Sequence, residues 1–146
     1  MYLLDSTHCL SVLHGFPGII QKLDDNRDVE LSINVVVVSE LIYGAYKSEQ
    51  VLPNLQRIEL FLEDFIIFDM DKETADICAK LKVAILDKFG PKSRSKRRNT
   101  TIESLGFGTN DLWIASSAIQ YNQILISADN DLWRLDSIEG LKIENW

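Results

Sequence analysis

The chain is poor in the residues that build disulfide frameworks and zinc sites. Its 146 residues include only two cysteines, Cys9 and Cys78, and two histidines, His8 and His14. The cysteine spacing fits neither a zinc site nor a disulfide framework, so both are expected to be buried as small apolar side chains. Neither histidine lies at ligand spacing to an acidic residue, which argues against zinc.

Long apolar runs and phosphate-binding motifs are also missing. No apolar stretch reaches the roughly 18 residues that a membrane-spanning helix needs. Met1 to Leu4 is followed at once by Asp5, without the basic start of a signal peptide, so a cytoplasmic location is expected. There is no Gly-rich phosphate loop and no elbow motif for a Ser-His-Asp arrangement.

Positive charge is in deficit. The chain has 15 basic and 22 acidic residues, a net charge of −7 and a pI of about 4.8. Taken alone, this balance argues against binding nucleic acid through a broad basic surface. It does not exclude a nuclease, because a metal site itself needs several carboxylates. A hydrophobic content of 46% and the length fit a single domain covering residues 1–146.

Short apolar runs alternate with segments of helical periodicity. Strands are predicted at 2–4, 29–33, 65–68, 123–127 and 141–143, and helices at 8–13, 18–23, 35–46, 49–63, 72–88, 110–121 and, as one turn, 130–134. This alternation predicts an α/β fold with a parallel sheet of four to five strands and helices on both faces. The run Val35–Val38 has strand propensity, but Asn34 is a good N-cap and the helical spacing of Val37, Leu41 and Gly44 favours a helix.

A long basic loop is predicted between residues 90 and 109. It has no acidic residue before Glu103, and its cations are Lys92, Arg94, Lys96, Arg97 and Arg98. Loops of this length inside a compact domain are usually functional or disordered. These cations therefore either contact the phosphates of a substrate or belong to a solvated loop.

Four carboxylates stand out from the other acidic residues because of their positions. Asp5 and Asp129 follow predicted strands, and ligands of open α/β sheets bind beyond the carboxyl ends of strands. Glu40 lies on or beside an apolar helix face, where an unpaired carboxylate costs several kcal/mol. Asp111 opens a helix. Hard oxygen ligands of this kind suit Mg²⁺ or Mn²⁺.

Each of the four also has a simpler interpretation. Asp5 fits a helix cap, unless Ser6 takes that role and leaves Asp5 free for a ligand. Glu40 fits a buried ion pair, and Asp111 fits favourable placement at a helix dipole. Asp129, or Asp131 two residues on, fits a turn residue that bonds its own backbone. No single acid is specific, and the combination in one small α/β chain is the stronger signal.

Four short motifs in this order resemble a known family. They are Leu3-Leu4-Asp5-Ser6, Ser39-Glu40-Leu41-Ile42-Tyr43-Gly44, Asn110-Asp111-Leu112-Trp113-Ile114-Ala115 and Leu125-Ile126-Ser127-Ala128-Asp129. With them, nearly the whole chain resembles a PIN domain, in particular the VapC-type toxin ribonucleases of bacterial toxin–antitoxin pairs. The segment 90–109 departs from the family pattern, because it is longer and more basic than the usual connection.

The resemblance implies a site, a cofactor and partners. It implies Asp5, Glu40, Asp111 and Asp129 as catalytic acids that bind Mg²⁺ or Mn²⁺, and Ser127 in the position of the family's hydroxyl. It also implies an RNA substrate, a VapB-like antitoxin and a homodimer, with docking surfaces on the second and fourth helices. The residues predicted to contact substrate are Ser6, Ser127, Lys92, Arg94, Lys96, Arg97 and Arg98.

The predicted reaction is metal-dependent hydrolysis of RNA phosphodiester bonds. One alternative is a protein of the same fold that acts mainly by binding a protein or RNA partner without cleavage. A phosphoacceptor receiver domain needs an adjacent acidic pair after the first strand, and Ser6 follows Asp5 here. The same residue removes the second aspartate expected of a haloacid-dehalogenase-type phosphatase.

Overall fold

The computed structural model describes all residues, 1–146, and is built on one parallel sheet. Its five strands lie in the order β3-β2-β1-β4-β5, and every neighbouring pair is parallel. Their bounds are β1 Tyr2–Leu4, β2 Leu31–Asn34, β3 Ile66–Phe68, β4 Ile124–Ile126 and β5 Lys142–Glu144. The predicted architecture of a parallel sheet flanked by helices is confirmed.

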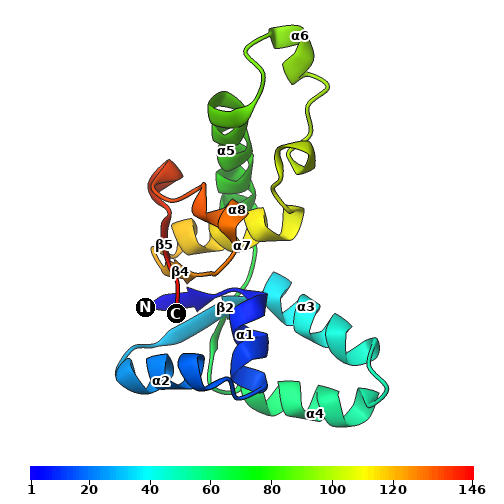
Figure 1. Cartoon of the computed structure of the whole chain (residues 1–146), viewed down its shortest axis with the longest axis vertical. Helices are drawn as coiled ribbons and strands as arrows, with labels where there is room; N and C mark the ends of the chain where they lie inside the picture. Colours follow the sequence, from blue (N-terminus) through cyan, green and yellow to red (C-terminus); the bar gives the residue numbers. More distant parts are fainter.

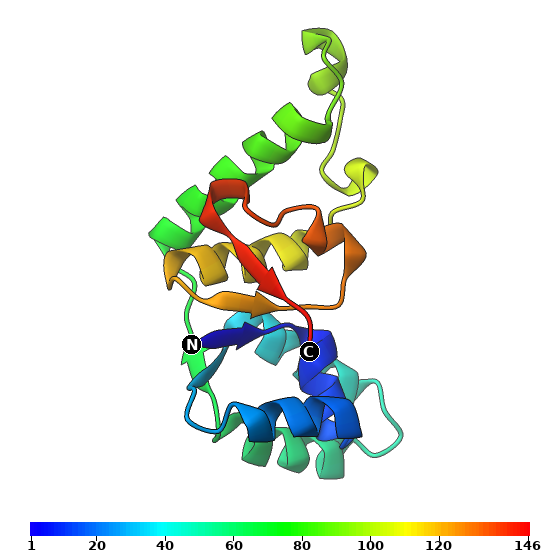
Figure 2. The same ribbon diagram turned by 60° about the vertical axis from the view of Figure 1, so that its left-hand side comes forward.

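Helices cover both faces of the sheet (Figure 1, Figure 2). Helices α1, α2 and α4 lie on one side, and α5 and α7 lie on the other. The bounds are α1 Ser6–Leu13, α2 Pro17–Asp25, α3 Val35–Tyr46, α4 Val51–Leu62, α5 Lys72–Phe89, α6 Arg94–Arg97, η1 Glu103–Leu105, α7 Thr109–Gln120, α8 Asn130–Trp133 and η2 Ile138–Gly140. None of these helices is long and apolar enough to cross a membrane.

The core lies between the sheet and these two helical layers. Leu3, Leu4 and Ile33 are completely buried on the central strands, as are Leu125 and Ile126. Residues on successive positions of one strand are buried together because a parallel sheet covered on both sides presents two apolar faces. Burial of this kind explains why the strands read as short continuous apolar runs.

The prediction of a helix at 35–46 is confirmed despite its four consecutive valines. Asn34 is the N-cap, and its Oδ1 accepts a hydrogen bond from the Val37 amide at 3.1 Å. Its Nδ2 donates to Ser117 Oγ on α7 at 2.9 Å. Val36 and Val37 are buried against the core. Capping and burial together outweigh the weak helix propensity of valine.

Two details differ from the sequence-based prediction. The helical period of the segment 49–63 predicts that Leu52 shares a face with Leu55 and Leu62, but Leu52, in the first turn of α4, is 73% exposed. The segment 90–109 was predicted to be irregular but contains two helical turns, α6 and η1. Both turns are too short, and the run rich in Ser, Arg and Lys is too polar, to show the apolar periodicity that predicts a helix.

The segment after α5 forms a projection at one end of the molecule. Figures 1 and 2 show α5 rising away from the sheet with α6 at its far end. The chain then returns through η1 to α7. At the base, the rings of Phe89 and Phe107 lie 5.5 Å apart, so the chain leaves and re-enters the fold at nearly the same place.

The sheet order places a switch point at the centre of the fold. The connections run from β1 to β2 and β3 on one side, and from β4 to β5 on the other. Crevices form at such a reversal, beyond the carboxyl ends of the strands on either side of it. Asp5 follows β1 and Asp129 lies three residues beyond β4, so both begin at this edge.

Candidate active site

Asp5 is held by the first turn of α1. Its Oδ1 accepts a hydrogen bond from the His8 amide at 2.7 Å and lies 2.9 Å from His8 Nδ1. Both side chains are buried. Of the two alternatives, Asp5 and not Ser6 is therefore the helix cap. Its second oxygen has no hydrogen-bond partner and remains free to bind a ligand.

Glu40 is half-buried on the second turn of α3 and is held by two donors. Asn110 Nδ2 donates to Oε1 at 2.7 Å, and the Ser6 hydroxyl donates to Oε2. The alternative of a buried ion pair with Lys or Arg does not hold, because no basic side chain pairs with Glu40. Neutral donors from α1 and α7 hold the carboxylate in place without cancelling its charge.

Asp111 lies in the first turn of α7 and is the electrostatic centre of the site. Burial is the largest cause that raises its pKa to about 6, and the charges of Asp129, Glu40, Asp5 and Asp131 contribute the rest in that order of effect. The three other predicted acids therefore act on this one carboxyl group. Asp111 also lies near the N-terminus of α7, where the helix dipole favours a negative charge. A favourable interaction with the dipole is therefore compatible with a role in the site.

Gly108 makes room for the Asp111 carboxylate. Gly108 is the N-cap residue of α7 and has an extended backbone with φ of −70°. A Cβ atom at this position would collide with Asp111 Oδ2. Glycine is thus required here by close approach of a side chain and not by an unusual backbone angle.

Asp129 caps α8 and is exposed. Its Oδ1 accepts hydrogen bonds from the amides of Asp131 and Leu132 at 2.6 and 3.2 Å. Ser127 is fully buried, and its Oγ accepts from the Asp129 amide at 3.1 Å. Asp131 pairs with Arg134 at 2.9 Å. Arg134 thereby offsets the charge of Asp131, which favours Asp129 as the fourth acid. Ser127 supports the turn that presents it.

The donor set fits a hard divalent cation. Every candidate ligand is a carboxylate, and several negative charges act on Asp111, while no lysine or arginine pairs with Asp5, Glu40 or Asp129. No three His, Cys, Asp or Glu side chains converge closely enough in this structure to enclose an ion. Binding a metal ion here therefore requires side-chain rotation of the acids.

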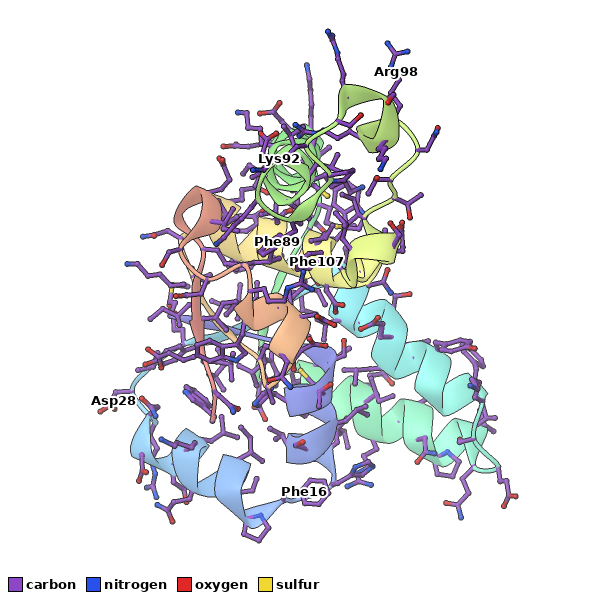
Figure 3. The ribbon with its side chains drawn as sticks, turned by 45° about the horizontal axis from the view of Figure 1, so that its top comes forward. Phe16, Asp28, Phe89, Lys92, Arg98 and Phe107 are labelled. Atoms are coloured by element: carbon purple, nitrogen blue, oxygen red, sulfur yellow. The ribbon has the colours of Figure 1, made fainter.

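The structure does not bring the basic side chains to the acids. Lys92, Arg94, Lys96, Arg97 and Arg98 lie on or next to α6, at the far end of the projection (Figure 1, Figure 3). Arg97 pairs with Asp87 of α5, and the other four are exposed. The expectation that they stand near the acidic site is wrong in position, because α5 carries the loop outward. Their contact with substrate stays a prediction.

Sequence reasoning gave no role to three residues that shape the site. The sequence predicts that His8 does not lie at ligand spacing to an acid. A separation of three residues at the start of α1 nevertheless brings His8 to Asp5. Asn110 bridges α7 to Glu40 across 70 residues of sequence, and no local pattern announces that contact. Gly108 directly precedes the helix that carries Asp111, and a glycine at that place in the sequence could have indicated close approach of a neighbouring group.

The family model of the PIN domain matches residues 2–138 of this chain. The chain belongs to the PIN domain family. The match covers all four predicted acids and the basic projection, so neither lies outside the domain.

Relatives of this PIN domain match over its full length. Ribonuclease VapC2 of Haemophilus influenzae is 30% identical over 146 residues, covering 99% of this chain and 97% of that protein. Ribonuclease VapC2 of Rickettsia felis is 27% identical, covering 100% and 98%. The solved structure of VapBC2 from Rickettsia felis, bound to a promoter DNA fragment, superposes with a TM-score of 0.78 at 23% identity. It covers 99% of this chain and 98% of that one. The last match supports the fold alone.

Proposed function

We propose that this protein is an endoribonuclease that hydrolyses RNA phosphodiester bonds, and that Asp5, Glu40, Asp111 and Asp129 bind Mg²⁺ or Mn²⁺. The observation that carries this proposal is that Asp5, Glu40 and Asp129 lie close enough to Asp111, at the switch point of the sheet, for their charges to act on it. Family membership and ribonuclease relatives over the full length support it. Ribonucleases with a PIN domain generally use a divalent metal.

The residues of the site divide into those that present oxygens and those that hold them. Ser6 and Asn110 orient Glu40, while His8 and the α1 amide fix one oxygen of Asp5 and leave the other free. Asp111 and Asp129 approach from α7 and from the turn after β4. These oxygens would hold a divalent cation, which when bound would supply activation of water and stabilisation of charge on the scissile phosphate.

The bound cation also explains how an acidic protein receives RNA. The unneutralised carboxylates repel a polyanion, and their repulsion is already visible in the raised pKa of Asp111. A bound divalent cation would neutralise part of this negative charge and so reduce the repulsion of RNA. The net charge of −7 is therefore compatible with an RNA substrate.

The protein acts in this proposal as the cytoplasmic toxin of a toxin–antitoxin pair, inhibited by a VapB-like antitoxin. This role is supported by the ribonuclease VapC2 relatives and by a VapBC structure from Salmonella typhimurium whose matching chain is 25% identical to this one. Exposed apolar side chains are present on the helices predicted to dock partners, with Ile20 on α2 and Leu52 and Leu60 on α4. A homodimer formed through such a surface stays a prediction.

The deciding experiment is cleavage of total RNA by purified protein free of antitoxin, in Mg²⁺ and in EDTA. We expect cleavage only in Mg²⁺, and loss of cleavage in the Asp5→Ala variant. Asp111→Asn distinguishes the ribonuclease from a protein that acts only by binding a partner. The variant should lose its effect if the protein is an enzyme, and should keep it if the protein only binds. Absence of metal-dependent cleavage with any RNA would contradict the proposed reaction.

A further inference from the structure

The projection between Phe89 and Phe107 concentrates positive charge in an otherwise acidic protein. Five of the chain's 15 basic residues lie within positions 92–98, with no acidic residue among them. The rest of the chain has ten basic residues against 22 acidic ones. We call residues 92–98 the basic tip. Such segregation creates a local positive potential on an anionic molecule and steers polyanions to one end.

Side-chain contacts connect the tip and its base to the domain. Arg134 lies over both rings at the base, with its guanidinium carbon 4.6 Å from the Phe89 centroid and 4.3 Å from that of Phe107. It also donates to the Leu105 carbonyl at 3.0 Å. Arg97 is paired with Asp87 at the end of α5. The cations are therefore held at a defined place relative to the acidic site.

The chemistry of the tip selects phosphates and not bases. Lys92, Arg94, Arg97 and Arg98 line an open hollow that has no apolar side chain on its wall. No aromatic residue occurs between Phe89 and Phe107, and Arg134 covers those two rings. Proteins that grip single-stranded RNA stack its bases on aromatic side chains, whereas double-helical RNA is contacted through its backbone.

The tip also lies away from the cleavage site. In Figures 1 and 2, α6 is at the far end of the molecule, while β1 and β4, which Asp5 and Asp129 follow, lie near its middle. Arg98 is nine residues from each of Phe89 and Phe107. At about 3.3 Å per residue, it reaches at most roughly 30 Å from the base. This reach from the base is comparable to one turn of a nucleic-acid duplex, which is about 34 Å in B-form DNA and somewhat shorter in RNA.

We infer that the basic tip is a second RNA-contact surface, which grips the backbone of a double-helical segment while the acids cleave elsewhere on the same molecule. This inference rests on the proposed ribonuclease function and assigns it a substrate class, a folded RNA with a helical part beside the cleaved region. Substrates too short to reach both places gain nothing from the tip.

The test compares two RNAs and two triple variants. The tip variant is Lys92→Ala/Arg94→Ala/Arg98→Ala, which spares the paired Arg97. The control variant, Lys22→Ala/Lys47→Ala/Lys72→Ala, removes the same charge from exposed positions outside the projection. One RNA is a hairpin with a stem of about ten base pairs, and the other is a single strand of about four nucleotides. Binding is measured by fluorescence anisotropy in EDTA, and cleavage in Mg²⁺.

For the hairpin, the tip variant is expected to raise the Kd about tenfold and to reduce the slope of log K against log salt by about 2–3, because three phosphate contacts are lost. The ratio of kcat/KM for hairpin over short strand is expected to fall about tenfold, and the control variant should leave this ratio unchanged. Equal effects of the two variants on Kd, or equal loss on both RNAs, would overturn the inference. Failure of the wild type to cleave any RNA refutes the proposed function alone, since the anisotropy still reports on the tip.

Discussion

Removing the charge of Asp111 should stabilise the metal-free protein. The pKa of this carboxyl is about 6 in the folded chain, against an ordinary value of 3.8. At about 1.4 kcal/mol per pH unit, the difference corresponds to about 3 kcal/mol of destabilisation when the group is fully ionised. The side chain is only half-buried, so solvent screening reduces this to roughly 1–1.5 kcal/mol. Asp111→Asn should recover that amount.

The pH dependence has a definite sign. A carboxyl with a raised folded pKa binds its proton more tightly in the folded state, so its ionisation opposes folding. The cost is absent below about pH 3.8, grows between pH 4 and 6, and is complete above about pH 6. The advantage of Asp111→Asn should therefore be full at pH 7.5 and fall to roughly a third at pH 4.5.

Thermal unfolding in EDTA checks this expectation. At pH 7.5, Asp111→Asn should raise the Tm by about 2–6 °C for a chain of this size. The matched control is Asp64→Asn, which removes the same charge from an exposed side chain without hydrogen bonds and should stay within about 0.5 kcal/mol of wild type. Excess Mg²⁺ should raise the Tm of wild type more than that of the variant. An unchanged or lower Tm in EDTA, or a gain independent of pH, would refute the reasoning.

Three further changes test the supports of the site. Gly108→Ala should displace the Asp111 carboxylate and lower Mg²⁺-dependent cleavage at least about tenfold, with circular dichroism unchanged, since φ at this position suits alanine. Ser6→Ala removes a donor to Glu40 and should weaken Mg²⁺ binding about tenfold in calorimetry, whereas Ser6→Thr should retain it. Arg134→Leu should lower the free energy of unfolding in urea by about 1–3 kcal/mol, because cation–π and hydrogen-bond contacts are lost. A decrease below about 0.5 kcal/mol would contradict the inference that Arg134 holds the base of the projection together.

Much of the fold was predictable because its elements alternate and its strands are apolar on both faces. The helix at Val35–Tyr46 was the hardest element, and the Asn34 cap was the local feature that identified it. Chain order alone could not give the strand order, which depends on long-range pairing between segments such as Tyr2 and Ile124. Periodicity predicts which residues face inward, but not where a helix overruns its core, as Leu52 shows.

The four acids were predictable as positions but not as geometry. Strand ends and a helix start brought Asp5, Asp129 and Asp111 to one edge by topology alone. The partners that hold them arise from contacts between separate helices, as between Asn110 and Glu40. Asp5 also showed that two interpretations of one residue were not exclusive, because one oxygen caps the helix while the other stays free.

The separation of the basic tip from the acids has a physical reason of its own. An arginine beside Asp111 would lower its pKa and occupy its oxygens, and a divalent cation would then have to displace it. Arg134 pairs with Asp131 next to the site, and no lysine or arginine pairs with Asp5, Glu40, Asp111 or Asp129. Placing the remaining RNA-attracting charge at the end of α5 keeps the acidic oxygens available to metal while the protein still attracts a polyanion. The free carboxylates that a metal ion needs and the basic side chains that attract RNA are thus kept at separate places in the same chain.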